Sequence, residues 1–107
     1  MIPMKNSFVF AATGATKTAT LHNNGMIIAY TMVTPDFTGN RTSQLSIQDE
    51  DNVTIYTGAA HNESGTYVVT GLTVPCDRQY TATVTLSGDA GGTGGTVTVK
   101  LFLKQQE

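Results

Sequence analysis

Tryptophan, paired cysteines and clustered positive charge are all missing from this chain of 107 residues. The single cysteine, Cys76, cannot form an internal disulfide, which argues against a secreted, disulfide-stapled immunoglobulin module. Charged residues make up only 13% of the chain, and its six lysines and arginines are scattered along it. Because a nucleic-acid footprint needs a basic stripe that neutralises phosphates, we predict no nucleic-acid partner.

Long apolar runs are missing as well. The segment Phe8–Ala12 is apolar but too short for the core of a signal peptide, and no segment is long enough to span a membrane. We therefore expect a protein that has no membrane partner and that is made and kept in a cytoplasm, or is released by lysis rather than by secretion.

Threonine is the abundant residue, with 19 copies. It is β-branched and keeps a hydroxyl, so it suits the solvated face of a pleated strand. Two segments in the last third, Gln79–Ser87 and Thr96–Lys104, alternate polar with apolar residues, which is typical of strands with one buried face. The residues predicted to face inward are Tyr80, Ala82, Val84 and Leu86 in the first segment and Val97, Val99, Leu101 and Leu103 in the second.

A glycine-rich segment, Gly88–Gly95, separates these two strands. A phosphate-binding loop would need a following helix, and a Walker loop would also need a Gly-Lys pair. Here a predicted strand follows, and the segment holds no lysine. We therefore predict that it is the flexible tip of a β-hairpin.

The first quarter of the chain has weaker patterns. Residues 1–7 show no periodicity and are predicted to form an N-terminal arm. Phe8–Ala12 and Ala15–Leu21 are interpreted as one strand that is interrupted at Gly14. The Asn24-Gly25 pair accepts positive φ at both central turn positions, and it therefore predicts a hairpin turn.

The strand predicted at Met26–Val33 carries apolar residues on both faces, with Ile27, Ala29 and Val33 opposite Met26, Ile28, Tyr30 and Met32. It is either a central strand that is covered on both sides or a strand with one face reserved for a partner. Further short elements are separated by turn-forming residues. Strands are predicted at Thr42–Gln48 (Leu45 and Ile47 inward), Val53–Gly58 (Val53 and Ile55 inward) and Gly65–Leu72 (Tyr67 and Val69 opposite Val68), and loops at 34–40, 49–52, 59–64 and 73–78.

Together these elements predict the fold class. Seven to eight short strands without a helical pattern favour an all-β chain that closes as a two-sheet antiparallel β-sandwich, immunoglobulin-like or jelly-roll in its path. Beyond the arm at residues 1–7, we expect one β-sandwich domain over residues 8–107.

Candidate chemistry is sparse. His22 and His61 have no second histidine or cysteine at metal-ligand spacing, and no Gly-x-Ser-x-Gly elbow occurs. For Cys76, a partly buried structural thiol is favoured over the alternative, a nucleophilic Cys–His pair. The run Asp49–Asp51 could supply oxygens to Ca²⁺, but it lacks the glycine and the distal Glu of a calcium loop, so an acidic turn is favoured. We predict no enzyme, no catalytic residue, no metal site and no cofactor.

Two runs, Gln44–Tyr56 (QLSIQDEDNVTIY) and Ser87–Leu101 (SGDAGGTGGTVTVKL), resemble small proteins encoded among the virion genes of tailed bacteriophages. The similarity covers most of the chain from Gly25 to Leu103. The resemblance implies a free-standing β-sandwich and a virion structural protein, first of all a capsid decoration, or cement, protein that binds the shell of major capsid protein. A neck, tail or fibre-associated virion protein is the alternative. The implied location is the capsid surface, after assembly in the host cytoplasm, and the implied oligomer is a dimer or trimer.

Such a role would need apolar contact surfaces. We expect them on the N-terminal arm, on the second face of the Met26–Met32 strand and at Phe102, which lies on the otherwise polar side of the last strand. An alternative of another class is a carbohydrate-binding β-sandwich module, although the absence of tryptophan weakens it. The candidate partner contacts are Ile2, Pro3, Met4, Phe8, Phe10, Met26, Ile28, Tyr30, Met32 and Phe102.

Overall fold

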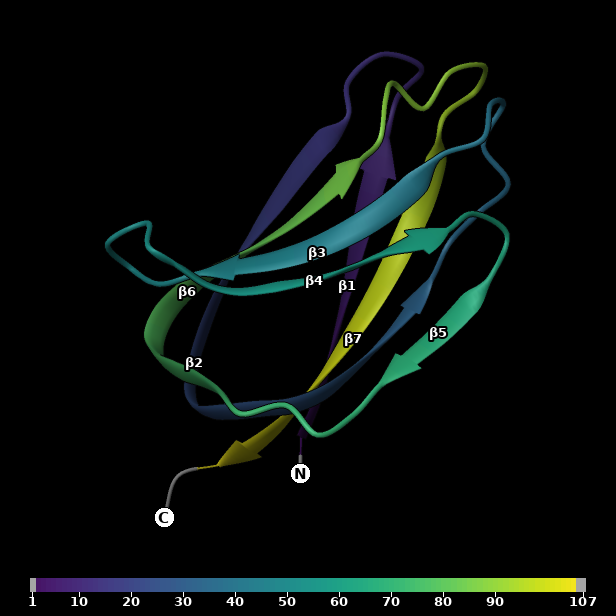
Figure 1. The fold of residues 1–107 in the computed structure, drawn as a ribbon. Coiled ribbons are helices and arrows are strands. Elements are labelled where there is room, and N and C mark those ends of the chain that lie inside the picture. Colours follow the sequence, from purple (N-terminus) through teal and green to yellow (C-terminus); the bar gives the residue numbers. More distant parts are fainter. Residues whose placement is uncertain (1, 106–107) are drawn as a thin grey trace.

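The computed structural model describes residues 2–105, which fold into two packed antiparallel layers of strands (Figure 1). The predicted fold class, an all-β two-sheet sandwich of seven to eight strands, is confirmed. Among the described residues no helix occurs, and so none that could cross a membrane. The strands are β1 (Ile2–Phe10), β2 (Thr16–Val33), β3 (Thr42–Gln48), β4 (Thr54–Asn62), β5 (Thr66–Val69), β6 (Val74–Leu86) and β7 (Gly95–Gln105).

The long strand β2 belongs to both layers. Its first part pairs with β6 from Thr16 to Ile27, and its second part pairs with β7 from Gly25 to Val33. The strand order is β1-β7-β2-β6-β3-β4, and β5 pairs with the last residues of β2. One layer therefore contains β1, β7, the end of β2 and β5, and the other contains the start of β2, β6, β3 and β4.

The hairpin turn predicted at Asn24-Gly25 is wrong, because β2 runs through these residues without a break. Gly25 pairs with both Cys76 of β6 and Gln105 of β7, at the point where the strand passes from one layer to the other. Pairing with two distant strands overrides the local turn propensity of the dipeptide.

A β-bulge in β2 changes which of its residues face inward. Ile27 pairs with Leu103 and Ala29 with Phe102, so Ile28 is an extra residue on β2. Beyond the bulge, Tyr30 and Met32 lie on the same side as Ile27, and all three are fully buried. The predicted division of this strand into two apolar faces is therefore wrong.

The predicted N-terminal arm is also wrong for residues 2–7. Strand β1 pairs with β7 over its whole length, from Ile2 opposite Leu103 to Phe10 opposite Gly95. Residues 2–7 lack periodicity because inward Asn6 breaks the apolar pattern, yet backbone pairing does not need it. The structure also separates β1 from β2 at residues 11–15, so the single interrupted strand predicted there does not form; Met1 lies outside the described residues.

The alternation predicted in the last third is confirmed. Every residue predicted to face inward in Gln79–Ser87 and Thr96–Lys104 is buried. The hairpin between them is wrong, since β6 pairs with β2 and β3 whereas β7 pairs with β1 and β2. The glycine-rich segment instead crosses from one layer to the other (Figure 1).

The middle of the chain agrees with the predictions in part. Strand β3 buries Leu45 and Ile47 as predicted, and residues 34–40 form a loop. Val53, predicted inward, is 56% exposed. Strand β4 extends through the predicted loop to Asn62, and β6 begins early at Val74. Pro75 is tolerated there because this end of β6 pairs with β2 alone, so one backbone side needs no donor.

Candidate functional site

Four of the predicted partner contacts belong to the core between the two layers. Phe8 and Phe10 of β1 point inward, and Tyr30 and Met32 of β2 do so after the bulge. Their exposed fractions are near zero, so they offer no surface to a partner. As contact residues they were predicted wrongly, because an apolar residue on a strand shows its face only once the register is known.

The other predicted contacts reach the surface to different degrees. Pro3 is exposed, Met26 is 37% exposed, and Met4 is half-buried against the core. Ile28 and Phe102 are both half-buried, and they come together at one place. The Ile2 side chain lies outside the described residues.

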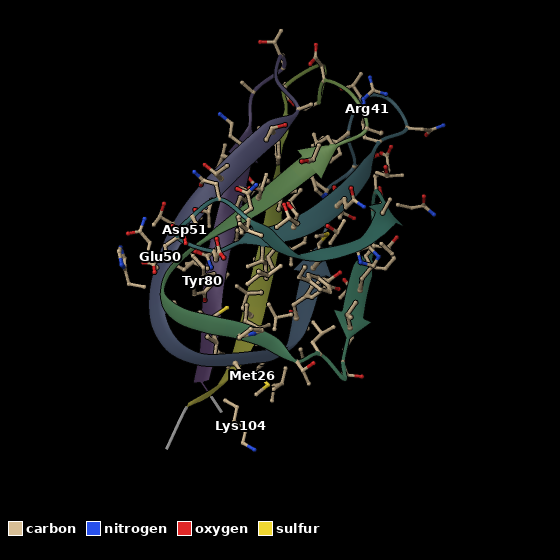
Figure 2. The ribbon with its side chains drawn as sticks, turned by 60° about the vertical axis from the view of Figure 1, so that its left-hand side comes forward. Met26, Arg41, Glu50, Asp51, Tyr80 and Lys104 are labelled. Atoms are coloured by element: carbon tan, nitrogen blue, oxygen red, sulfur yellow. The ribbon has the colours of Figure 1, made fainter. Side chains whose placement is uncertain are left out.

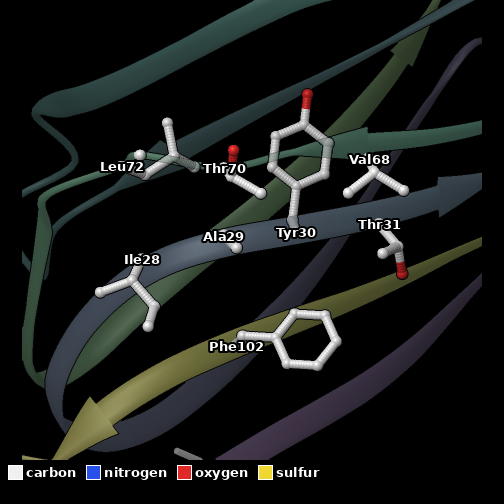
Figure 3. A pocket seen from close by; sticks show the side chains of 9 residues that line it. Ile28, Ala29, Tyr30, Thr31, Val68, Thr70, Leu72 and Phe102 are labelled. Carbon is white, nitrogen blue, oxygen red and sulfur yellow. The ribbon is translucent and has the colours of Figure 1, made fainter.

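That place is a hollow of about 480 Å³ on the surface of the sandwich (Figure 3). Ile28 and Thr31 of β2 and Phe102 of β7 lie on the opposite side of the β2 ribbon from the Tyr30 ring (Figure 3). The hollow also has walls on the Tyr30 side of the ribbon, where Val68, Thr70 and Leu72 are drawn in the same view. Its lining is almost wholly apolar and consists of Ile28, Ala29, Tyr30, Thr31, Val68, Thr70, Gly71, Leu72 and Phe102.

Two irregular backbone features build this hollow. The bulge in β2 turns two consecutive residues, Ile28 and Ala29, toward it. After β5, the chain turns at Gly71, whose φ of 74° is readily adopted only by glycine. The Leu72 amide then donates a 2.9 Å hydrogen bond to the Ile28 carbonyl, which ties the far wall to the bulge.

The hollow opens on the outer face of the β1–β7–β2–β5 layer. Strand alternation and register place one set of residues outward on this layer. The set contains three of the chain's six basic residues and no Asp or Glu. We call it the lysine face; it consists of Pro3, Lys5, Ser7 and Val9 of β1, Ala29, Thr31 and Val33 of β2, Thr66 and Val68 of β5, and Thr96, Thr98, Lys100, Phe102 and Lys104 of β7.

Lysines surround the aromatic wall of the hollow. Lys100 and Lys104 flank Phe102 along β7, two residues away on either side. Lys5 of β1 lies directly opposite Lys100 in the register. Like charges directly opposite each other on one sheet face repel, so this pair costs stability unless an anionic group lies nearby. Figure 2 shows Lys104 beside Met26, at some distance from Glu50 and Asp51.

The outer face of the other layer has a different composition. It is uncharged over its centre, where Thr83 of β6 lies between Thr18 of β2 and Ser46 of β3. We call it the threonine face; its central residues are Thr16, Thr18 and Thr20 of β2, Thr81, Thr83 and Thr85 of β6, and Gln44, Ser46 and Gln48 of β3.

An aromatic cluster lies between the layers at the β4 and β5 side. The Tyr30 hydroxyl and His61 Nε2 are 2.9 Å apart, and the His61 ring stacks on Tyr67 at 4.4 Å between centroids. Burial lowers the pKa of His61 and raises that of Tyr30, so both groups are uncharged at neutral pH and share this hydrogen bond. The Tyr67 hydroxyl donates to the Asn62 carbonyl at 2.8 Å. These groups bond to one another and form an interior brace.

Cys76 lies in the core, as the prediction of a structural thiol requires. Burial raises the pKa of its thiol to about 12, and so the nucleophilic thiolate is scarce at neutral pH. His61 is engaged with Tyr30, and His22 is exposed on β2. The structure therefore does not assemble the Cys–His pair considered from the sequence.

The acidic run Asp49–Asp51 forms the predicted turn between β3 and β4. The Asp49 carboxylate accepts hydrogen bonds from the amides of Asp51 at 2.9 Å and Val53 at 3.0 Å, and Asn52 adopts a φ of 62°. This carboxylate therefore closes the turn. Over the part of the chain that the structure describes, no group of three or more His, Cys, Asp or Glu residues is placed to hold a metal ion.

The glycine-rich segment is tied to its neighbours. Arg41 Nε donates a 2.6 Å hydrogen bond to the Asp89 carbonyl, and the Gly91 amide donates to the Ala12 carbonyl at 2.8 Å. Positive φ angles at Gly91, Gly92 and Gly94 let the backbone turn between the layers. Its glycines serve this crossover.

Comparison with known proteins shows a shared fold without a shared family. No family model matches the chain, and no curated protein does. Among solved structures, PirA has a TM-score of 0.52 at 11% identity, over 94% of this chain and 93% of that one. The Yersinia pseudotuberculosis-derived mitogen has a TM-score of 0.50 at 5% identity, over 99% of this chain and 89% of that one. At such identities the likeness shows the fold alone.

Viral capsid proteins are also among the similar structures. The VP2 protein of infectious bursal disease virus has a TM-score of 0.39 at 13% identity, over 92% of this chain and 31% of that one. A likeness of this degree carries no argument about function.

Sequence reasoning selected three residues that line the hollow, Ile28, Tyr30 and Phe102, although the Tyr30 side chain is buried in the core. It did not select Val68, Gly71 or Leu72. A signal was present for Val68, because the alternation in Gly65–Leu72 places it opposite Tyr67 and Val69. The sequence does not indicate that β5 and β7 lie on either side of β2, because this arrangement depends on pairing between segments that are distant in the chain.

Proposed function

We propose that this protein is a structural component of a bacteriophage virion, a capsid decoration protein that binds the assembled shell of major capsid protein. The observation that carries this proposal is the apolar hollow on the lysine face, a concave surface built on the sandwich. The resemblance of Gln44–Tyr56 and Ser87–Leu101 to virion proteins supports the placement in a virion.

In this proposal the protein acts by adhesion and catalyses no reaction. A hollow of about 480 Å³ has room for one large side chain, so each contact is modest. A shell repeats its surface by symmetry, and many modest contacts then sum to a stable coat. Within residues 2–105, strands β1 and β4 each pair with a neighbour on one side only. Such free edges are where copies of the chain would pair to form the expected dimer or trimer.

Quantitative mass spectrometry of purified virions tests this function. We expect on the order of hundreds of copies per particle, as symmetric coverage of a shell requires. A copy number near that of a single portal or tail ring would instead support the neck or tail alternative. Absence from washed particles would contradict a virion role altogether.

A further inference from the structure

We propose that the lysine face binds an acidic segment of its protein partner, with one large apolar side chain of that segment seated in the hollow between β2, β5 and β7. This inference deepens the proposed function, on which it rests, by naming the chemistry of the partner segment. The walls that would hold the apolar side chain are Ile28, Val68, Leu72 and Phe102.

The apolar part of the ligand follows from the lining of the hollow. Apart from Tyr30, whose hydroxyl is hydrogen-bonded to His61, its polar lining side chains are those of Thr31 and Thr70. The bulge in β2 and the turn at Gly71 shape its walls. Val68 is 67% exposed, and it lines the hollow together with Ile28, Leu72 and Phe102, so its apolar surface belongs to a continuous patch. Burying such surface against an apolar side chain is favourable because it removes both from water.

The acidic part of the ligand follows from the charges around Phe102. Lys100 and Lys104 lie four residues apart on β7, a separation of about 13 Å at a strand rise of about 3.3 Å per residue. Lys5 stands opposite Lys100, and the lysine face has no Asp or Glu to neutralise them. Carboxylates on either side of the seated side chain would meet this positive potential and relieve the repulsion between Lys5 and Lys100.

A second copy of this chain fits the lysine face poorly. Two such faces packed against each other would bring six lysines together, three from each copy. Like-charge contacts of this kind disfavour association. The lysine face could still bind the acidic turn of another copy, where Glu50 and Asp51 are exposed. The experiment therefore has to distinguish this self-association from binding of a different partner.

The test uses the full chain and defined blocked peptides. The probe is Asp-Thr-Phe-Thr-Asp, and its controls are Lys-Thr-Phe-Thr-Lys and Asp-Thr-Gly-Thr-Asp. In ¹⁵N-labelled protein titrated with the probe, we expect chemical-shift changes at the amides of Thr31, Val68 and Phe102 and none at Thr83. We expect both controls to bind at least about tenfold more weakly, because each lacks one half of the complementarity. Equal binding of the three peptides, or shifts on the threonine face, would overturn the proposal.

Matched variants test the two halves separately. Val68→Ser should weaken probe binding several-fold, whereas Val53→Ser, the same change at an exposed valine on the β3–β4 turn, should not. The double variant Lys100→Glu with Lys104→Glu should weaken it by about tenfold or more, whereas Lys17→Glu on β2 should not. All five positions are at the surface, and circular dichroism checks that each variant folds. Equal effects of a variant and its control would refute the assignment.

Two further measurements exclude other occupants. Analytical ultracentrifugation compares the natural chain with the double variant Glu50→Lys and Asp51→Lys, and we expect the same degree of self-association in both. Self-association that the double variant abolishes would mean that the lysine face binds a second copy of this chain. Vesicles of phosphatidylserine should not bind; if they do so while the peptides are not distinguished, the face is a membrane surface. These binding experiments use the isolated chain and no virions. Their failure would therefore contradict only the acidic partner segment, whereas absence of the protein from purified virions would contradict the proposed function.

Discussion

The two outer faces of this sandwich are built from the same kind of strands but carry different surfaces. The threonine face is uncharged and regular, with Thr83 opposite Thr18 and Ser46. The lysine face combines a like-charge pair, Lys5 and Lys100, with an apolar hollow. Threonine side chains suit the solvent-exposed face of a sheet, because they are β-branched and their hydroxyls bind water. Repulsion between lysines and exposed apolar surface, in contrast, both lower the free energy of unfolding. The difference identifies the lysine face as the one that stability alone does not explain.

The largest effect should separate the inside of the β1–β7–β2–β5 layer from its outside. Leu101→Ala removes a fully buried side chain and should lower the free energy of unfolding by about 2–5 kcal/mol. Lys100→Ala, the adjacent exposed position, should change it by no more than about 0.5 kcal/mol. Urea denaturation measures both. A large cost at Lys100 would mean that the lysines serve stability, and the contrast between the two faces would be lost.

A smaller effect should come from the turn that shapes the hollow. Gly71→Ala meets no neighbouring atom, but the φ of 74° should cost roughly 1–2 kcal/mol of unfolding free energy. The control is Thr70→Ala, an exposed neighbour that should be close to neutral. Thermal unfolding compares the two variants. A neutral Gly71→Ala would show that the turn relaxes easily and that the hollow is not held open by its backbone.

Making the lysine face resemble the threonine face should stabilise the protein. Lys100→Thr removes the repulsion with Lys5 and should raise the free energy of unfolding by about 0.2–1 kcal/mol at low salt. The gain should shrink as salt screens the charges. In the reciprocal control, Thr83→Lys introduces a charge without a charged neighbour opposite and should have little effect. Destabilisation by Lys100→Thr would mean that Lys100 already has a favourable partner within the monomer.

The smallest effect concerns the interior brace, which leaves both outer faces unchanged. Burial lowers the pKa of His61 below its ordinary value of 6.5, so the unfolded chain binds a proton more readily than the folded one. The contribution of neutral His61 to the free energy of unfolding is therefore complete above pH 6.5, and it is lost as the pH falls through 6.5 toward the lowered pKa. Melting temperatures measured over this range should fall in the natural chain and fall less in His61→Gln. Equal pH dependence in both would exclude His61 as the cause.

The inward faces were accessible to sequence reasoning and the strand partners were not. Leu45, Val84 and Leu101 were predicted inward and are fully buried, because period-two alternation is a local property. Tyr30 and Met32 were assigned to a possible contact face, because one bulge reversed the register of β2. No local signal marks that bulge, since it lies where the pairing of β2 with β6 ends and its pairing with β7 continues.

The sequence by itself determined an all-β chain, the residues that face inward in Gln79–Ser87 and Thr96–Lys104, and a low charge with scattered basic residues. The tertiary structure alone decided that β2 joins the two layers, that β6 and β7 are not a hairpin and that Phe102 meets Val68 across β2. The physical reason is distance along the chain. Alternation is decided between residues that are neighbours in sequence, whereas a surface such as the lysine face exists only after distant strands have chosen their partners.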